Sequence, residues 1–352
     1  MPDFDFINAA YGKPHRRVPI WIMRQAGRYL PEYRAVREKV SFARLCRSPE
    51  LIARVTRQPI DIFGMDAAIL FSDILLPLEP MGIKIDYEEG GPVLSPLVRN
   101  PDDLGQFEWY DPSDGMDYVL AGIRETKKHL GDAAPLIGFC GSPFTLACYM
   151  IEGGGSWRFA EIKKFLYNFP EESTRLLSYL AELSGRYLKA QIDAGVDAVQ
   201  VFDSWGGILP PDLYREFSLV YIQTIFDFCK TENIPRILYL NNSAPYLKLL
   251  SNIDCEVISV DWRTDLTDAM AILEGKTIQG NLDPHALLGP TGSLVQHAVR
   301  ILETTAGKDN FIFNLGHGIL PQTPVENVKM LVDTVHSFRH EEIPAAMKHR
   351  KP

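Results

Sequence analysis

The chain has 352 residues, enough for one large domain or two medium ones, and its 46% hydrophobic and 23% charged residues are typical of a globular protein. A net charge of −9 argues against nucleic acid as a partner, and no apolar stretch reaches the roughly 18 residues that cross a membrane. Five cysteines without a CxxC pair, and an N-terminus without an apolar signal region, predict a cytoplasmic protein without a disulfide framework.

Short apolar runs recur along the chain, and most of them end in polar residues or glycine, as the buried strands of a parallel sheet do. The weakest of these runs covers only two residues. The strands predicted in this way lie at residues 18–23, 67–71, 135–140, 198–202, 237–240, 257–260, 277–278 and 311–313.

Longer segments with a helical period separate these runs. Pro49 after Ser48 is typical of a helix start, and Thr323 and Glu326 have the spacing of a capping box. Glycine follows several of the segments, as it does at helix C-termini. The helices predicted in this way start at Ser48 and Thr323, or cover residues 116–130, 171–194, 211–230, 265–274 and 293–306.

Alternating short strands and helices indicate parallel strands joined by right-handed crossovers. Eight such units predict the α/β class and a single-domain (β/α)8 TIM barrel over residues 1–352, with short terminal extensions. Residues 83–97 alternate around Glu-Gly-Gly and predict a β-hairpin inserted after the second strand. The alternative is an open doubly wound sheet, but no GxGxxG follows the first strand, and this favours the barrel.

In a barrel the active site lies at the carboxyl ends of the strands. Arg24 and Arg28 follow the first predicted strand, and guanidinium groups bind carboxylates or phosphates through paired hydrogen bonds. They are also common in solvated surface loops. Asp73 follows the second strand, where it either accepts hydrogen bonds and stabilises a cation, or caps the next helix.

Three further candidates follow later strands. Tyr149 lies in a predicted helical turn, where an aromatic ring is usually part of the core, although a buried hydroxyl still needs a partner. Ser204 has no neighbouring histidine and no GxSxG motif, which argues against a hydrolase. His317 stands between two glycines, which allow a ligand to approach closely, and its imidazole can bind a carboxylate.

The sequence predicts neither a metal site nor a P-loop. The histidines show no HxxxH or HxH spacing, and no cysteine lies near a second ligand. The Gly153-Gly154-Gly155 run lacks the Lys-Ser/Thr of a P-loop and is interpreted as a flexible turn.

Two long segments resemble signatures of the uroporphyrinogen decarboxylase family: VPIWIMRQAGRYLPEYR at 18–34 and IGFCGSPFTLACYMIEGGGS at 137–156. The segments ILFSDIL, VQVFDSWGG, IQGNLDP and FNLGHGILP resemble the other strand ends of that family, so the resemblance runs from about residue 5 to about residue 340. It implies a single-domain (β/α)8 barrel, usually a homodimer, which needs no metal or organic cofactor and removes the four acetate carboxylates of uroporphyrinogen III to give coproporphyrinogen III.

The resemblance also assigns roles to residues. It implies that Asp73 binds the pyrrole N–H groups and stabilises a protonated ring, with Arg24 and Tyr149 as the other catalytic residues. For the proton donor, Arg24 is the first candidate, with water or a substrate carboxyl group as rivals, because a guanidinium is a poor acid. The implied substrate-binding residues are Arg24, Gln25, Ala26, Gly27, Arg28, Asp73, Tyr149, Ser204 and His317.

Two alternatives stay open. Zinc-dependent methyltransferases that act on corrinoids or thiols share this barrel, but they carry His-x-Cys after the fifth strand and a cysteine near the eighth. This chain has LYLNNSAP and LGHG at those places. The second alternative is a tetrapyrrole-binding protein without catalytic activity, and the intact set of polar strand-end residues argues against it.

Overall fold

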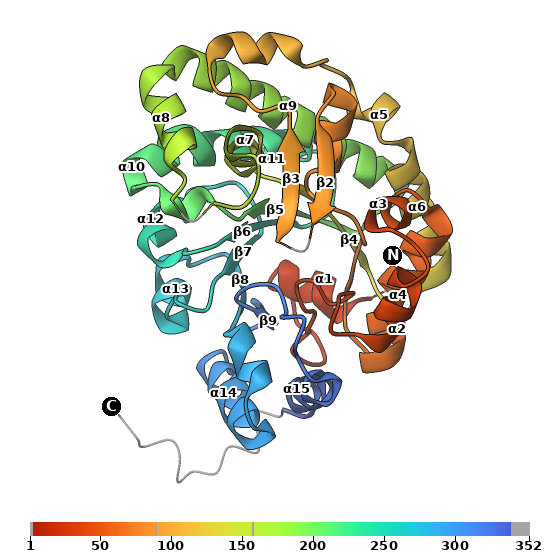
Figure 1. The fold of residues 1–352 in the computed structure, drawn as a ribbon. Helices are drawn as coiled ribbons and strands as arrows, with labels where there is room; N and C mark the ends of the chain where they lie inside the picture. Colours follow the sequence, from red (N-terminus) through yellow and green to blue (C-terminus); the bar gives the residue numbers. More distant parts are fainter. Residues whose placement is uncertain (1–2, 89, 157, 339–352) are drawn as a thin grey trace.

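The computed structural model describes residues 3–88, 90–156 and 158–338, so the ends of the predicted domain lie outside the described residues. Seven parallel strands form one curled sheet in the order β1-β4-β5-β6-β7-β8-β9 (Figure 1). The strands are β1 Ala68–Ile69, β4 Leu136–Gly141, β5 Ala198–Asp203, β6 Arg236–Leu240, β7 Val257–Val260, β8 Thr277–Leu282 and β9 Phe311–Leu315.

Seven of the eight predicted strands are therefore confirmed in position. The strand predicted at 277–278 was too short, since β8 continues to Leu282. Gln279, Gly280 and Asn281 interrupt the apolar pattern in the sequence, although Gln279 and Asn281 are buried in the structure. The prediction for residues 18–23 was wrong in extent. That segment makes a single isolated bridge, between Ile20 and Phe313 of β9, and is not a full strand.

The short segment around Ile20 nevertheless joins the two edges of the curled sheet. On one side the Phe313 N–H donates to the Pro19 carbonyl at 2.9 Å. On the other side the Asp66 N–H, just before β1, donates to the Ile20 carbonyl at 2.8 Å. The sheet is therefore TIM-barrel-like, with Pro19–Trp21 in the gap between β9 and β1.

Polar side chains cross the interior of the curled sheet. The Trp21 indole N–H donates to Gln279 Oε1 at 2.9 Å, and Gln279 Nε2 donates to Ser259 Oγ at 2.9 Å and to Gln200 Oε1 at 3.2 Å. All four residues are buried. Because they come from the first segment, β5, β7 and β8, these bonds hold distant strands around one filled interior.

Helices cover the outside of the sheet, with α9 above it and α14 and α15 below it in Figure 1. The capping box predicted at Thr323 was wrong: α15 begins one residue later, at Val325, and Pro324 occupies the N-cap without a side-chain hydrogen bond. The helices are α1 Asp5–Ala10, α2 Pro31–Arg37, α3 Phe42–Cys46, α4 Pro49–Phe63, α5 Pro112–Gly115, α6 Asp117–Leu130, α7 Pro143–Glu152, α8 Ala160–Asn168, α9 Pro170–Ala194, α10 Pro211–Tyr214, α11 Val220–Phe228, α12 Leu247–Leu250, α13 Leu266–Ile272, α14 Thr291–Thr304 and α15 Val325–Ser337.

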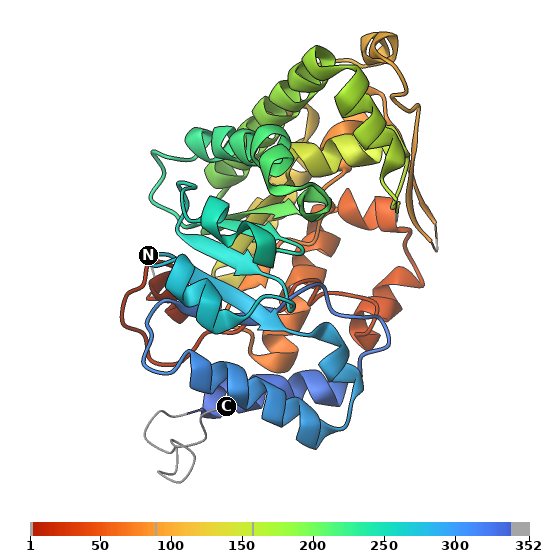
Figure 2. The same cartoon turned by 90° about the vertical axis from the view of Figure 1, so that its left-hand side faces the viewer.

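In the region where the sequence predicts a hairpin, β2 (Lys84–Glu88) and β3 (Gly91–Ser95) pair antiparallel in a sheet of their own. In Figure 2 the arrowheads of the parallel strands point to the right, the side on which this orange pair extends. The pair packs on the main body, because the Leu94 N–H donates to the Gly153 carbonyl at 2.8 Å and the Tyr87 and Phe42 rings lie 4.5 Å apart. The pair therefore stands beside the carboxyl ends of the strands.

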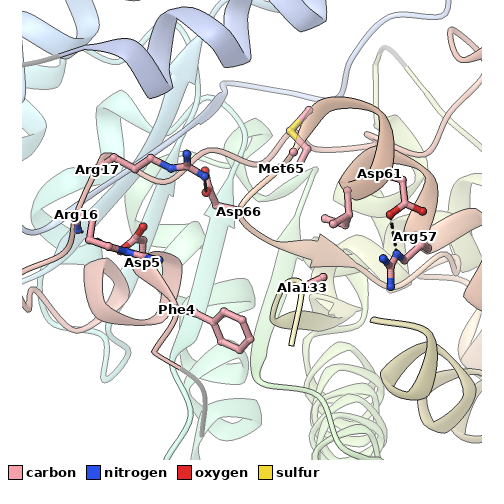
Figure 3. Close-up of a pocket in the computed structure, with 11 residues that line it drawn as sticks. Phe4, Asp5, Arg16, Arg17, Arg57, Asp61, Met65, Asp66 and Ala133 are labelled. Atoms are coloured by element: carbon pink, nitrogen blue, oxygen red, sulfur yellow. Dashed lines mark hydrogen bonds and ion pairs between the residues drawn. The ribbon is translucent and has the colours of Figure 1, made fainter. Parts of the chain in front are cut away.

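Asp66 links three distant parts of the chain at the opposite end of the sheet. Its carboxylate accepts from Arg17 at 2.7 Å, from the Ile20 N–H at 2.8 Å and from His336 of α15 at 2.7 Å. Figure 3 shows Arg17 beside Asp66 in a cavity of about 470 Å³. That cavity lies where the strands begin, away from the predicted site residues.

We expect Asp66→Asn to lower the free energy of unfolding by about 2–3 kcal/mol at pH 7, because hydrogen bonds to a charged acceptor are lost. Burial raises the pKa of Asp66, but His336, the Ile20 N–H and Arg17 together hold it below its usual range. A carboxyl group with a depressed pKa stabilises the fold above its unfolded pKa of about 3.9 and loses that effect as the pH falls through its folded pKa. Urea titrations at several pH values test this: the two proteins should differ most above pH 5 and converge in acid, and a constant difference would contradict it.

Candidate active site

Arg24 is held in an unusual backbone conformation just after the Ile20 bridge. Its φ is 66°, in the left-handed region that few residues other than glycine adopt. A Cβ on Gly27 would lie 2.7 Å from the Arg24 carbonyl oxygen, and a Cβ on Gly318 would lie 2.6 Å from Arg24 Cδ. Gly27 therefore leaves room for the Arg24 main chain, and Gly318, in the loop after β9, leaves room for its side chain.

The charge of Arg24 acts on side chains from several strand ends. It lowers the pKa of Asp73 after β1, of Tyr149 in α7, of Tyr239 in β6 and of His317 after β9. Such an effect requires that the groups lie near the guanidinium. The structure therefore brings Arg24, Asp73, Tyr149 and His317 into one region, which we call the mouth.

Asp73 is partly buried in this region. Its Oδ1 accepts from the Leu75 N–H at 2.8 Å. The short 3-10 helix that follows, Leu76–Met81, has Leu75 at its N-cap and no side-chain cap hydrogen bond, so Asp73 does not cap it. Burial raises the pKa of Asp73 and Glu79 adds to the rise, whereas the Leu75 N–H and Arg24 oppose it. The carboxylate is thus costly to ionise by itself, and a cationic ligand beside it would lower that cost.

His317 is neutral at pH 7. Burial, Arg24 and Arg263 lower its pKa to about 4, against an opposing effect of Asp261 and a backbone hydrogen bond with Gly318. Its ring centroid lies 6.3 Å from that of Tyr239 and 6.1 Å from that of Trp262. A carboxylate bound beside it would favour the protonated form again.

Ser204 lies on the loop after β5, which is held by hydrogen bonds to the side chain of Asp203. That buried carboxylate accepts from Ser142 Oγ at 2.7 Å, Ser218 Oγ at 2.7 Å, Thr145 Oγ1 at 3.0 Å and the Gly206 N–H at 3.0 Å. Ser204 itself is partly exposed. The network therefore holds the loop that presents its hydroxyl.

Tyr149 packs on the same loop. Its ring centroid lies 6.3 Å from that of Trp205, the residue after Ser204. Burial and Asp73 raise the pKa of Tyr149, against smaller effects of Trp205 and Arg24. Tyr149 is therefore a partly buried phenol close to both charged groups of the mouth, and not only a core aromatic.

The neighbours of Arg24 in the sequence are placed differently. Gln25 is buried, with Oε1 accepting from the Ile22 N–H and Nε2 donating to the Ala67 carbonyl, both at 3.0 Å. Its side chain is therefore part of the fold, and a substrate contact by this residue would use the main chain. Ala26 and Gly27 are partly exposed, and Arg28 is exposed, with its charge acting on Tyr33.

Tyr87 of β2 is a candidate site residue that the sequence did not predict. Its hydroxyl is buried and has no hydrogen-bond partner among the described residues. Burial raises its pKa and the charge of Asp73 raises it further, so this phenol lies near Asp73. The predicted hairpin contained the signal, but only the packing of that hairpin against the main body shows which of its residues lies near Asp73.

We expect Gly318→Ala to lower kcat/KM by about tenfold or more, because the added methyl group would displace the Arg24 side chain and a small misplacement of a site residue is costly. Gly292→Ala is the matched control, since nothing lies within 4 Å of a Cβ there. Steady-state kinetics and thermal melting of the two variants test this. Equal kcat/KM values in two well-folded variants would show that Gly318 does not position Arg24.

None of the described helices is long and apolar enough to cross a membrane. Within the described residues, no group of three or more His, Cys, Asp and Glu side chains is arranged to hold a metal ion.

Comparison with known proteins identifies the family. The family model described as uroporphyrinogen decarboxylase (URO-D) matches residues 1–338. The chain belongs to the uroporphyrinogen decarboxylase family. It is 48% identical over 338 residues to the uroporphyrinogen decarboxylase of Syntrophotalea carbinolica, covering 96% of this chain and 98% of that protein. It is 46% identical to that of Trichlorobacter lovleyi, covering 94% and 97%.

Solved structures show how widely the fold of this family member is shared. A methyltransferase from Methanosarcina mazei has a TM-score of 0.79 at 23% identity, over 94% of this chain and 96% of the other. A B12-independent methionine synthase from Shewanella has a TM-score of 0.58 at 10% identity, over 85% and 89%. At such identities the likeness concerns the fold alone.

Proposed function

We propose that this chain is a uroporphyrinogen decarboxylase, which removes the four acetate carboxylates of uroporphyrinogen III as CO2 and releases coproporphyrinogen III for porphyrin biosynthesis. Membership of the family over residues 1–338 supports the activity. The single structural observation that supports it best is the position of Arg24, whose charge acts on Asp73, Tyr149 and His317 together.

Loss of CO2 from an acetate leaves an electron pair that needs an acceptor. In our proposal a pyrrole ring is first protonated on carbon, and the C–C bond electrons then flow into that cationic ring as CO2 leaves. The methylene carbon takes up one proton and the ring carbon returns its proton. Each acetate thus consumes one proton in total and becomes a methyl group, so the substrate supplies the electron sink that many decarboxylases obtain from a cofactor.

Asp73 stabilises this cation in the proposed mechanism. Four pyrrole N–H groups converge at the centre of the macrocycle, and a carboxylate beneath them accepts their hydrogen bonds. Burial raises the pKa of Asp73, which means that its ionised form is poorly solvated. A positively charged ring therefore stabilises the carboxylate, and this stabilisation is largest when the ring carries its full charge. This is stabilisation of the transition state more than of the ground state.

The remaining residues bind the acidic side chains of the substrate in this proposal. Arg24 and Arg28 supply positive charge in a protein whose net charge is −9. Tyr149, Ser204 and His317 supply hydrogen bonds, and Gln25, Ala26 and Gly27 contribute main chain. Arg24 is our candidate for the proton donor, although a guanidinium holds its proton tightly, and a water molecule or a substrate carboxyl group is the alternative.

The proposal includes the finer features of the fold and assembly. It takes the chain as one domain, a closed (β/α)8 barrel in which the segment around Ile20 acts as the eighth strand and β2–β3 is an insertion. The Ile20–Phe313 bridge supports the closure. It also takes the protein as a cytoplasmic homodimer without cofactor. The five buried, free cysteines support the compartment, and sedimentation would test the dimer.

Incubation with chemically reduced uroporphyrin III, followed by separation of the products by carboxylate number, tests the activity. We expect species with seven, six, five and finally four carboxyl groups, with one CO2 released at each step. Binding of uroporphyrinogen without CO2 release would favour the tetrapyrrole-binding alternative. Stoichiometric zinc in the purified protein, together with methyl transfer to a thiol, would favour the methyltransferase alternative.

A further inference from the structure

Arg263 follows β7, and its guanidinium contacts Asp261, Asn241 and Trp262. Its Nη1 contacts Asp261 Oδ2 at 2.6 Å and Asn241 Oδ1 at 3.4 Å. Its guanidinium carbon lies 3.9 Å from the Trp262 ring centroid, a cation–π contact. The side chain is nevertheless 46% exposed. An exposed arginine normally samples many rotamers, so two polar contacts and an aromatic platform are more than solvation requires.

The support beneath Arg263 is itself fixed. The Asp261 side chain is fully buried, and its Oδ1 accepts from the Ser243 N–H at 3.0 Å, from Ser243 Oγ at 3.1 Å and from Thr264 Oγ1 at 3.1 Å. Only Oδ2 is turned to Arg263. The carboxylate is therefore already well supplied with donors, and it acts as an anchor that fixes where the guanidinium points.

Arg263 lies beside the mouth, because it packs on Trp262, whose ring centroid lies 6.1 Å from that of His317. Its charge and that of Arg24 both lower the pKa of His317 and of Tyr239. In the order of the sheet, β7 lies four strands from β1. In a curled sheet of seven strands, that spacing brings Arg263 to the side that faces Asp73.

The guanidinium has free donors. Among the described residues, both of its hydrogen bonds are made by Nη1, so the N–H groups of Nε and Nη2 remain for a ligand. Two N–H groups on one edge of a guanidinium match the two oxygens of a carboxylate.

We propose that Arg263 is a further substrate-binding residue, which takes a peripheral carboxylate of the tetrapyrrole on the side of the mouth away from Asp73. This inference rests on the proposed function for the identity of the ligand. Trp262 and Asp261 act as positioning residues, because they touch the guanidinium and not the carboxylate. The mouth then holds cations on two facing sides, with Asp73 beneath the ring. A substrate that carries acid groups around its whole edge is matched by that arrangement.

The test compares Arg263→Ala with Arg300→Ala, an exposed arginine on α14, in kinetics with uroporphyrinogen III and in binding of oxidised uroporphyrin III. We expect Arg263→Ala to raise KM and the dissociation constant by about tenfold, with kcat within about threefold, because a contact made equally in ground and transition states is lost. Arg300→Ala should match the wild type. Unchanged KM and dissociation constant in a folded Arg263→Ala protein would overturn the inference.

Arg263→Gln is the second variant, since it keeps an N–H donor for Asp261 and Asn241 but carries no charge. It should weaken binding to a similar degree and raise the pKa of His317 in NMR titrations, where Arg24 and Asp261 remain as the charged groups that face it. An unchanged His317 pKa would show that Arg263 does not face the mouth, and would overturn the inference.

The binding arm separates the two proposals. A wild type that binds uroporphyrin but releases no CO2 would refute the proposed function, and weakened binding in Arg263→Ala would still support the inference. Turnover by the wild type with unchanged binding in the variant would refute the inference alone. A wild type that neither binds nor reacts would refute both.

Discussion

Asp73→Asn should reduce kcat by about 100- to 1000-fold while the protein stays folded. The amide keeps the shape and the oxygen that accepts from the Leu75 N–H at 2.8 Å, so the change in unfolding free energy should stay below about 1 kcal/mol. It removes the negative charge, however, and with it the stabilisation of a protonated pyrrole. KM should change much less than kcat, because the charge matters most when the ring is cationic.

Asp86→Asn provides the matched control for this variant. Asp86 lies on β2, with its side chain 51% exposed and paired with the exposed Lys84. The same substitution of a carboxylate by an amide is therefore made near the mouth, at a residue that does not contact Asp73 or Arg24. Rates from product separation and melting curves for both proteins decide the outcome. A collapse of the melting temperature in Asp73→Asn, with normal specific activity in the folded fraction, would mean that Asp73 serves the fold and not the reaction.

Asp203→Ala should destabilise the protein more than Asp66→Asn or Asp73→Asn, with a loss of roughly 3–6 kcal/mol. It leaves three buried hydroxyl groups and the Gly206 N–H without their shared acceptor. A loss of that size is a large part of the roughly 5–15 kcal/mol that holds a typical domain together. Activity should fall too, because the loop with Ser204 and Trp205 is held by this network.

Asp203→Asn should lose less stability than Asp203→Ala, since one oxygen can still accept and a serine hydroxyl can turn to accept from the amide. Asp212→Ala, an exposed change at the start of α10, should leave stability within about 0.5 kcal/mol of the wild type. Urea unfolding of the three variants gives the order. Equal stability of Asp203→Ala and Asp212→Ala would refute the view that Asp203 is the acceptor at the centre of this loop.

Local patterns suffice for much of the fold. Seven parallel strands and their helices follow from apolar periodicity, because a buried strand or an amphipathic helix places its apolar residues at a regular spacing within a short stretch of sequence. The polar strand ends are visible for the same reason, so Arg24, Asp73, Tyr149, Ser204 and His317 could be selected as candidates. Their roles in catalysis and binding stay predictions.

What the sequence by itself determined is the order of the elements and the chemical character of each strand end. Only the tertiary structure decided that the first apolar run pairs through Ile20 alone, that Gln25 serves the fold, and that a glycine at 318 leaves room for Arg24. Tertiary structure likewise decided that Arg263, through Trp262, lies near His317, whose pKa is also lowered by Arg24 from far earlier in the chain. The physical reason is that these facts depend on hydrogen bonds, packing and fields between residues that are distant in sequence, and no local pattern of residues encodes such contacts.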